Sequence, residues 1–203
     1  MLKAINITAW DSTRIVAWTY AGRNHFIWDK AQHLVAVEWG NHLVLLNPNT
    51  ITGRAFNKGV EVMGKKKEKL IRTAWRSFCN DSFWLNAPAK VFDEGTQRSL
   101  VTLKDGRQGL MVTYTGGGVT PGDSYVWLLD ESGLPIAWKM WVKIIPIGGL
   151  ETTWANWKVL PTGAKIATVH EIGGISLRVT NLKVANSYEE MEQVSPFALY
   201  PEL

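Results

Sequence analysis

Apolar and polar residues alternate with a period of two over most of the chain, which is typical of β-strands with two different faces. Between Arg14 and Phe56, short alternating segments are separated by turn-forming sequences such as Gly22-Arg23-Asn24 and Asn47-Pro48-Asn49. This pattern predicts a meander of four or five strands. A second run of strands begins at Phe83 and continues for about a hundred residues, with breaks too closely spaced for crossover helices. The sequence therefore predicts a long antiparallel sheet.

One segment, residues 65–81, changes to the period of an α-helix. Its apolar residues recur at helical spacing and cover an arc of about 140°, and they are Leu70, Ile71, Ala74, Trp75 and Phe78. Arginine, serine and threonine occupy the opposite face. We expect an amphipathic helix that packs on an apolar surface and acts as a lid over it.

The last seventeen residues, 187–203, differ from the strands before them. Ser187 followed by Glu190 is a capping-box pattern, which predicts a short helix through Gln193 that ends at Pro196. Phe197, Leu199 and Tyr200 then form a C-terminal docking tail. Because no linker or repeat divides the chain, we expect residues 1–203 to form a single domain.

The chain contains eleven tryptophans, and most of them alternate with other residues along predicted strands. Lys139 and Lys143 should point to water, which places the residues of opposite parity along this strand on the inner face. That face carries Tyr125 and Trp127 on one strand and Trp138, Met140, Val142 and Ile144 on the next. A sheet of many strands must curl to bury its apolar face and its edges.

An apolar concave surface with a few polar tips is the usual composition of a ligand pocket, although the same side chains also suit a packed core. The predicted ligand-binding residues are Trp75, Tyr125, Trp127, Trp138, Met140 and Trp154.

Composition excludes several classes of protein. Hydrophobic residues make up 46% and charged residues 20% of the chain, which is typical of a folded globular protein. The net charge of +4 is concentrated around Lys65-Lys66-Lys67, a pattern typical of a solvated helix end, so no nucleic-acid partner is expected. No apolar run is long enough for a membrane-spanning helix.

The start of the chain is too short and too polar for a secretory signal. The protein is cytoplasmic if Met1 is its native start, and periplasmic or associated with the outer membrane if an export signal has been removed.

Candidate chemistry is sparse. Cys79 is the only cysteine, and the four histidines are scattered singly, so we expect neither a metal site nor a cofactor. Carboxylates such as Asp93 and Asp123 could form a glycosidase pair, with tryptophans as sugar platforms, if they lie at the required separation. A hydrolase acting on a carbohydrate or a lipid ester is therefore an alternative function.

Three phrases of the sequence, at 80–85 (NDSFWL), 119–125 (VTPGDSY) and 134–142 (LPIAWKMWV), resemble an uncharacterised group of bacterial envelope proteins. That group is related in fold to the LolA/LolB-type periplasmic lipoprotein carriers. The resemblance implies a mainly β fold, in which a curved antiparallel sheet forms an incomplete, half-open β-barrel covered by an amphipathic helix. Carriers of this type hold acyl chains without catalysis.

This chain has no clear counterpart of the arginine that secures the closed lid in the carriers. The resemblance therefore implies binding of a hydrophobic or amphiphilic molecule, such as a lipid or an acyl chain, rather than transfer of lipoproteins specifically. We expect a non-catalytic binding protein of the bacterial envelope, whose partners include membrane lipid or a lipoprotein. The remaining alternative is a structural interaction module whose exposed tryptophans contact a partner.

Overall fold

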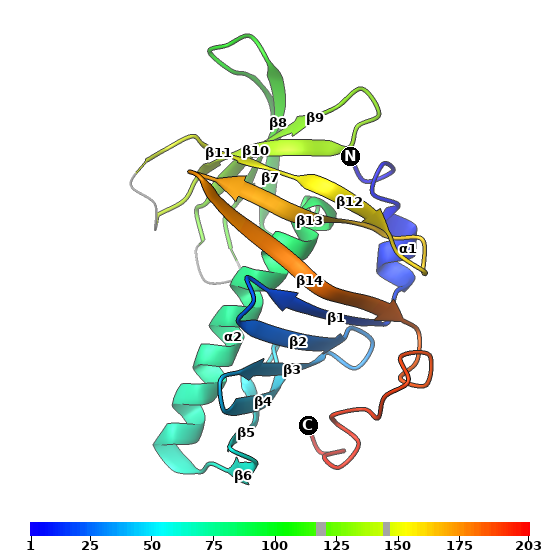
Figure 1. Cartoon of the computed structure of the whole chain (residues 1–203). Helices are drawn as coiled ribbons and strands as arrows, with labels where there is room; N and C mark the ends of the chain where they lie inside the picture. Colours follow the sequence, from blue (N-terminus) through cyan, green and yellow to red (C-terminus); the bar gives the residue numbers. More distant parts are fainter. Residues whose placement is uncertain (117–120, 144–146) are drawn as a thin grey trace. The chain divides into compact units, whose positions relative to one another are not determined.

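The computed structural model describes residues 1–116, 121–143 and 147–203 (Figure 1). Two residues of the phrase at 119–125, and Ile144, lie outside this range. The helices are α1 (Ile7–Ser12), α2 (Gly64–Asn86) and the 3₁₀-helix η1 (Ala87–Lys90). The strands are β1 (Ile15–Tyr20), β2 (Asn24–Asp29), β3 (Leu34–Trp39), β4 (His42–Asn47), β5 (Thr52–Asn57), β6 (Val60–Glu61), β7 (Thr96–Thr102), β8 (Gln108–Tyr114), β9 (Ser124–Leu129), β10 (Pro135–Trp141), β11 (Leu150–Thr153), β12 (Ala155–Val159), β13 (Lys165–Ile172) and β14 (Ile175–Ala185).

The chain forms two compact units. Unit 1 comprises Met1–Trp10, Phe83–Val159 and Ala164–Arg178, and unit 2 comprises Asp11–Ser82, Leu160–Gly163 and Val179–Leu203. Strand β14 contributes to both: its first residues pair with β13, and its residues from Val179 onward pair with β1. The single domain expected over residues 1–203 stays a prediction.

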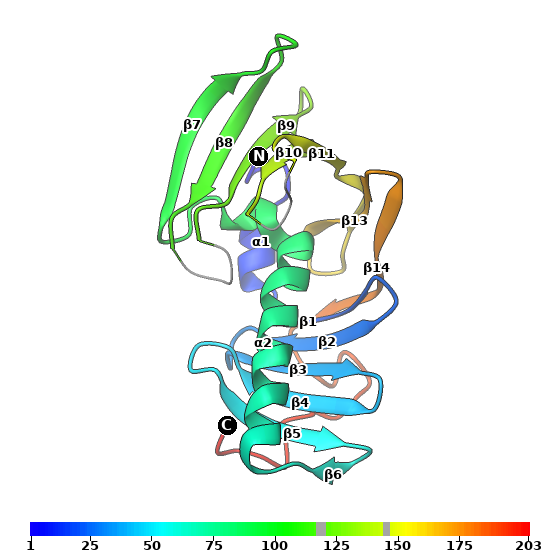
Figure 2. The same cartoon turned by 90° about the vertical axis from the view of Figure 1, so that its left-hand side faces the viewer.

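Unit 2 is a meander with a helix on one face and the C-terminal segment on the other. Its strand order is β6-β5-β4-β3-β2-β1-β14, and every pair is antiparallel. Trp18 of β1 and Phe26 of β2 stack at 4.6 Å between ring centroids, and Phe78 of α2 lies 6.4 Å from each of them. Within this unit, α2 runs across the strands (Figure 2). The alternation read from the sequence therefore produces one face that packs against the helix.

The opposite face of the unit 2 sheet is also apolar. Leu34, Ala36 and Leu45 are buried there against Phe197 of the C-terminal segment. Unit 2 thus has three layers, with the sheet in the middle. Strands β3 and β4 are buried on both faces for this reason, which gives them a continuous apolar sequence.

Unit 1 contains the second set of strands, in the order β14-β13-β11-β10-β9-β8-β7, with β12 paired to β13. All its strand pairs are antiparallel. The core of this unit is largely aromatic and centres on Trp127 and Trp138, both fully buried.

The predicted fold class is confirmed: the fold is mainly β, with an antiparallel sheet that does not close and one long amphipathic helix. The strand order ends at β6 on one side and β7 on the other, so both are edge strands. Of the predicted helical stripe, Leu70, Ile71, Ala74 and Phe78 are buried. In the described residues, no helix has the length and hydropathy needed to span a membrane.

Two details of the sequence reading were wrong. The helix does not end at residue 81, because α2 continues through Phe83 to Asn86 and is followed by η1. The residues from Ser187 form turns instead of a helix. Ser187 Oγ does accept a hydrogen bond from the backbone N–H of Glu190, but Glu192 has a positive φ of 54°, which a right-handed helix cannot contain.

Candidate functional site

Five of the six predicted ligand-binding residues lie together in unit 1. The register of β9 and β10 places Trp127 opposite Trp138 and Tyr125 opposite Met140. Trp154 follows directly after β11. All five side chains belong to the buried core, and the most exposed of them, Tyr125, has an exposed fraction of 8%. The five residues therefore share one buried face, as strand parity predicted, and a role for them in ligand binding stays a prediction.

These aromatic rings pack directly against one another. The ring centroids of Trp127, Trp138 and Trp154 are 4.8 to 5.0 Å apart in all three pairs, and Tyr125 lies 4.5 Å from Trp138. Such distances are those of stacked and edge-to-face aromatic pairs. Tyr125 and the three tryptophans thus form an aromatic cluster in the described structure, and Met140 belongs to the same core.

The last turns of α2 cover this cluster. Phe83 lies 5.7 Å and Trp84 5.1 Å from Trp138, measured between ring centroids. His170 of β13 contacts Trp154 at 4.4 Å, and its Nδ1 lies 3.1 Å from the carbonyl oxygen of Thr153. Burial lowers the pKa of His170 to about 4, so its ring is neutral at neutral pH.

Trp75, the sixth predicted residue, belongs to the part of α2 that lies in unit 2. Its side chain is half-buried. The structure therefore assigns it to a different unit from the other five, and a role for it in ligand binding stays a prediction.

The aromatic cluster contains buried donors that lack a hydrogen-bond partner among the described residues. These are the indole N–H groups of Trp127, Trp138 and Trp154. Native structures bury few unpaired polar groups, so each is a notable feature. The steep angles between the rings, 72° for Trp138 and Trp154, suit weak contacts between the edge of one indole and the π-face of another.

A small cavity lies beside the cluster in unit 1. Trp10, Leu85, Trp157 and Ile166 are among its lining residues, and its volume is about 10 Å³. Such a space holds about one water molecule and is far below the hundreds of Å³ of a typical ligand pocket.

Unit 2 contains a much larger open groove, of about 420 Å³. We call it the tail groove, and its lining residues are Glu38, Gly40, Asn41, His42, Leu43, Leu45, Phe56, Gly59, Pro196 and Tyr200. Leu43 of β4 is paired with Phe56 of β5, so both side chains lie on the same face of the sheet. Glu38, Asn41 and His42 contribute polar side chains, so the lining of the groove is part apolar and part polar.

The C-terminal segment forms one wall of the tail groove. The ring of Tyr200 lies 5.8 Å from that of Phe56, and the guanidinium of Arg54 lies 4.2 Å over the same tyrosine ring. Arg54 also donates hydrogen bonds to Glu61 of β6 and Glu202 of the C-terminal segment. The wall is therefore held by stacking and by two ion pairs.

Sequence reasoning did not identify the tail groove. Residues 42–46 belonged to the predicted strand meander, and Tyr200 to the predicted C-terminal docking tail. The sequence does not indicate which strands the C-terminal tail contacts. A direct signal was the apolar character of both faces of 42–46, which requires a second covering layer.

The carboxylates considered for hydrolysis have structural partners. Asp93 forms an ion pair with Lys90, and Asp123 is buried and accepts a hydrogen bond of 3.1 Å from the backbone N–H of Lys143. A glycosidase needs a general acid whose pKa is raised. A role for Asp93 and Asp123 in hydrolysis stays a prediction.

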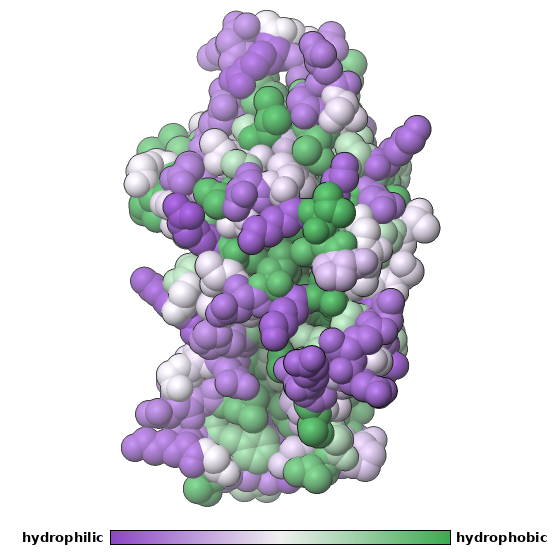
Figure 3. All heavy atoms as spheres, turned by 45° about the vertical axis from the view of Figure 1, so that its right-hand side comes forward, coloured by the Kyte–Doolittle hydropathy of each residue, from purple (hydrophilic) through white to green (hydrophobic). Residues whose placement is uncertain are grey.

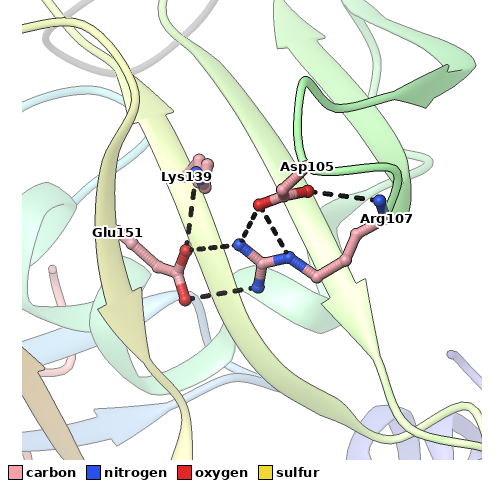
Figure 4. A network of polar contacts seen from close by, with 4 residues as sticks. All are labelled: Asp105, Arg107, Lys139 and Glu151. Atoms are coloured by element: carbon pink, nitrogen blue, oxygen red, sulfur yellow. Dashed lines mark hydrogen bonds and ion pairs between the residues drawn. The ribbon is translucent and has the colours of Figure 1, made fainter.

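A second acidic group lies in an exposed ion-pair network (Figure 4). Arg107 contacts Glu151 at 3.0 Å and Asp105 at 2.7 Å, and Lys139 lies 3.6 Å from Glu151. Hydrogen bonding to Arg107 lowers the pKa of Asp105 to about 2 and also lowers that of Glu151. These shifts favour charged, structural carboxylates. The described residues contain no group of three potential metal ligands.

Comparison with known proteins gives a limited result. No protein-family model matches the chain, and no curated protein matches it. Among solved structures, a DUF1329 family protein from Desulfovibrio piger is 10% identical, with a TM-score of 0.38, and the match covers 89% of each chain. A putative outer membrane lipoprotein-sorting protein domain from Vibrio parahaemolyticus is 10% identical, with a TM-score of 0.39, and the match covers 94% of this chain and 95% of that one. These are proteins of the two kinds that the sequence resemblance indicated, and at such TM-scores neither carries an argument about function.

Proposed function

We propose that this protein binds a hydrophobic or amphiphilic molecule, such as a lipid or an acyl chain, in the bacterial envelope and catalyses no reaction on it. The observation that carries the proposal is the tail groove, which combines a volume of about 420 Å³ with apolar walls from Leu43, Phe56 and Tyr200. A guest that buries about 200 Å² of apolar surface there gains about 5 kcal/mol before the cost of association. The expected affinity is modest and the specificity broad.

The polar groups at the groove suit an amphiphile. Glu38 and Asn41 are exposed, and Nδ1 of His42 is buried without a hydrogen-bond partner in the described part of the chain. A ligand with an apolar body and a polar end fits this arrangement, because the apolar walls take the body and the polar residues take the end.

The aromatic cluster is a second place where such a guest is proposed to bind. Trp127, Trp138 and Trp154 are in contact in the described structure, so a guest enters only if the rings separate. Their unpartnered indole N–H groups are donors that a carbonyl or phosphate oxygen of a guest would satisfy. The location in the periplasm or at the outer membrane is supported by the sequence resemblance to envelope proteins.

Titration of the intact protein with the apolar fluorophore N-phenyl-1-naphthylamine, and native mass spectrometry with palmitate, test the proposal. We expect saturable uptake, which the Leu43→Gln variant in the tail groove reduces at least about tenfold, because a polar side chain replaces part of an apolar wall. Ile51→Gln is the matched control, since Ile51 is an exposed residue outside the groove lining.

The Trp138→Leu variant distinguishes the two places. Loss of uptake in Trp138→Leu but not in Leu43→Gln would show that the guest binds in the aromatic cluster and not in the tail groove. Circular dichroism confirms that each variant is folded before its uptake is measured. Absence of saturable uptake by the folded wild-type protein, with both the fluorophore and palmitate, would overturn the proposal.

A further inference from the structure

One end of unit 2 carries exposed apolar and basic residues side by side. The β5–β6 turn, β6 and the first turn of α2 lie together in both views of the fold (Figures 1 and 2). Val60 and Met63 have exposed fractions of 71% and 70%. We call this surface the basic tip, and its residues are Lys58, Val60, Met63, Lys65, Lys66, Lys67 and Lys69.

The segment that carries the basic tip has an excess of positive charge. Residues 58–69 contain five lysines and two glutamates, whereas the whole chain has a net charge of +4. Glu61 is bound by Arg54, although it also lies within electrostatic range of Lys67, and Glu68 is exposed. In the described residues, Lys58, Lys65, Lys66 and Lys69 form no salt bridge.

The lysines at the start of α2 are unfavourable for the helix itself. The first turn of α2 has no acidic residue, so Lys65, Lys66 and Lys67 lie next to the positive end of the helix dipole. Lys65 and Lys69 are four residues apart on the helix, a spacing at which like charges repel. Helix stability therefore does not account for these lysines, and an anionic partner would balance their charge.

The apolar side chains at the basic tip indicate what kind of anionic partner fits. The hydropathy view shows hydrophobic surface beside hydrophilic side chains at this end of unit 2 (Figure 3). Lysines attract anionic lipid headgroups, and exposed apolar side chains between them enter the boundary between headgroups and acyl chains. A single-stranded nucleic acid would instead require aromatic residues for base stacking, and the basic tip has none.

We propose that the basic tip docks the protein on an anionic phospholipid membrane, with Val60 and Met63 entering the interfacial layer and the lysines contacting phosphate groups. The basic tip adjoins the tail groove at the β5–β6 turn, where Gly59 lines the groove. Docking does not require an occupied groove. The proposal adds a membrane contact to the binding function and does not depend on it.

Sedimentation of the intact protein with vesicles tests the proposal. We expect binding to vesicles of equal parts phosphatidylglycerol and phosphatidylcholine, little binding to pure phosphatidylcholine, and loss of binding as salt rises from about 0.05 M to about 0.5 M. The double variant Lys65→Glu/Lys66→Glu should bind at least about tenfold more weakly. Because acidic residues at a helix start are favourable, its loss of binding is not explained by unfolding.

The matched control is Lys158→Glu/Lys183→Glu, which changes the net charge by the same amount at exposed positions outside the basic tip. Met63→Ser should weaken vesicle binding and leave its salt dependence unchanged. Equal losses in the two double variants would mean that only net charge matters and would overturn the proposal, as would equal binding to neutral vesicles. Fluorophore uptake by the same variants should stay at the wild-type level, which separates this test from that of the tail groove.

Discussion

The carboxylate of Asp81 on α2 accepts a hydrogen bond of 2.7 Å from Nδ2 of Asn24 on β2. Asp81 is buried, with an exposed fraction of 3%, and its other oxygen accepts a hydrogen bond from the exposed Asn80. The Asn24→Ala substitution should lower the free energy of unfolding by about 1 to 3 kcal/mol, because a buried carboxylate loses a donor. Urea unfolding at neutral pH measures this loss. Asn80→Ala should cost less, and equal effects of the two variants would contradict the assignment.

The same carboxylate makes stability depend on pH. Burial raises the pKa of Asp81 above its ordinary value of 3.8, so the folded protein binds more protons than the unfolded chain between the two pKa values. Stability from this group is therefore greatest below the ordinary value and falls as pH rises through the raised one. Asp81→Asn removes the dependence, so the variant should gain stability relative to wild type between about pH 4 and pH 7. A constant difference between the two proteins across that range, in urea unfolding, would refute this.

Gly53 on β5 has no room for a side chain. A Cβ atom at this position would lie 2.0 Å from the carbonyl oxygen of Leu45 on the neighbouring strand. Gly53→Ala should therefore lower the free energy of unfolding by at least about 2 kcal/mol, since the backbone must move. Gly116→Ala is the control, because no atom of the described residues, chain neighbours apart, lies within 4 Å of the added Cβ. Its effect should stay within about 0.5 kcal/mol. Similar thermal unfolding midpoints for the two variants would show that β5 adapts.

Lys30 should be the most reactive lysine near neutral pH. Partial burial lowers its pKa to about 8, and its ammonium lies 6.0 Å from the ring of Trp28. A larger share of its amine is uncharged near pH 8 than is usual for a lysine. Brief labelling with acetic anhydride followed by peptide mass spectrometry should modify Lys30 faster than the exposed Lys66. Equal labelling rates for the two would be inconsistent with the lowered pKa.

The sequence was sufficient to predict whether most segments form a strand or a helix, because each of these elements has a face in contact with a core. Alternation identified the strands from Ile15 to Asn57, and the stripe from Leu70 to Phe78 identified α2. The end of α2 was missed, since Asn80-Asp81-Ser82 has the composition of a loop. Inside the helix, one oxygen of the buried Asp81 carboxylate is bound by Asn24, which lies 57 residues earlier in the chain. Such a distant partner leaves no local signal.

For the candidate site too, local sequence predicted some features, whereas others depend on contacts between distant residues. Strand parity placed Trp127 and Trp138 on one buried face, but it did not reveal whether their rings enclose space or fill it. The answer depends on ring orientation, which side-chain packing decides. The tail groove was missed because it exists only when Tyr200 returns to Phe56, and the contact between these rings is not encoded in any short pattern.

Strand β14 has a consequence for the order of events in folding. The residues from Ile175 to Ala185 are hydrogen-bonded to β13 on one part and to β1 on the other, and the contact with β1 joins Ile15 to Ala185. Closing so long a stretch of chain is entropically costly, and such contacts slow folding. Before the ribosome has released the residues from 175 onward, β1 and β13 each lack the strand that β14 later provides. The strands of unit 1 and those of unit 2 can therefore be completed only after β14 has been synthesised.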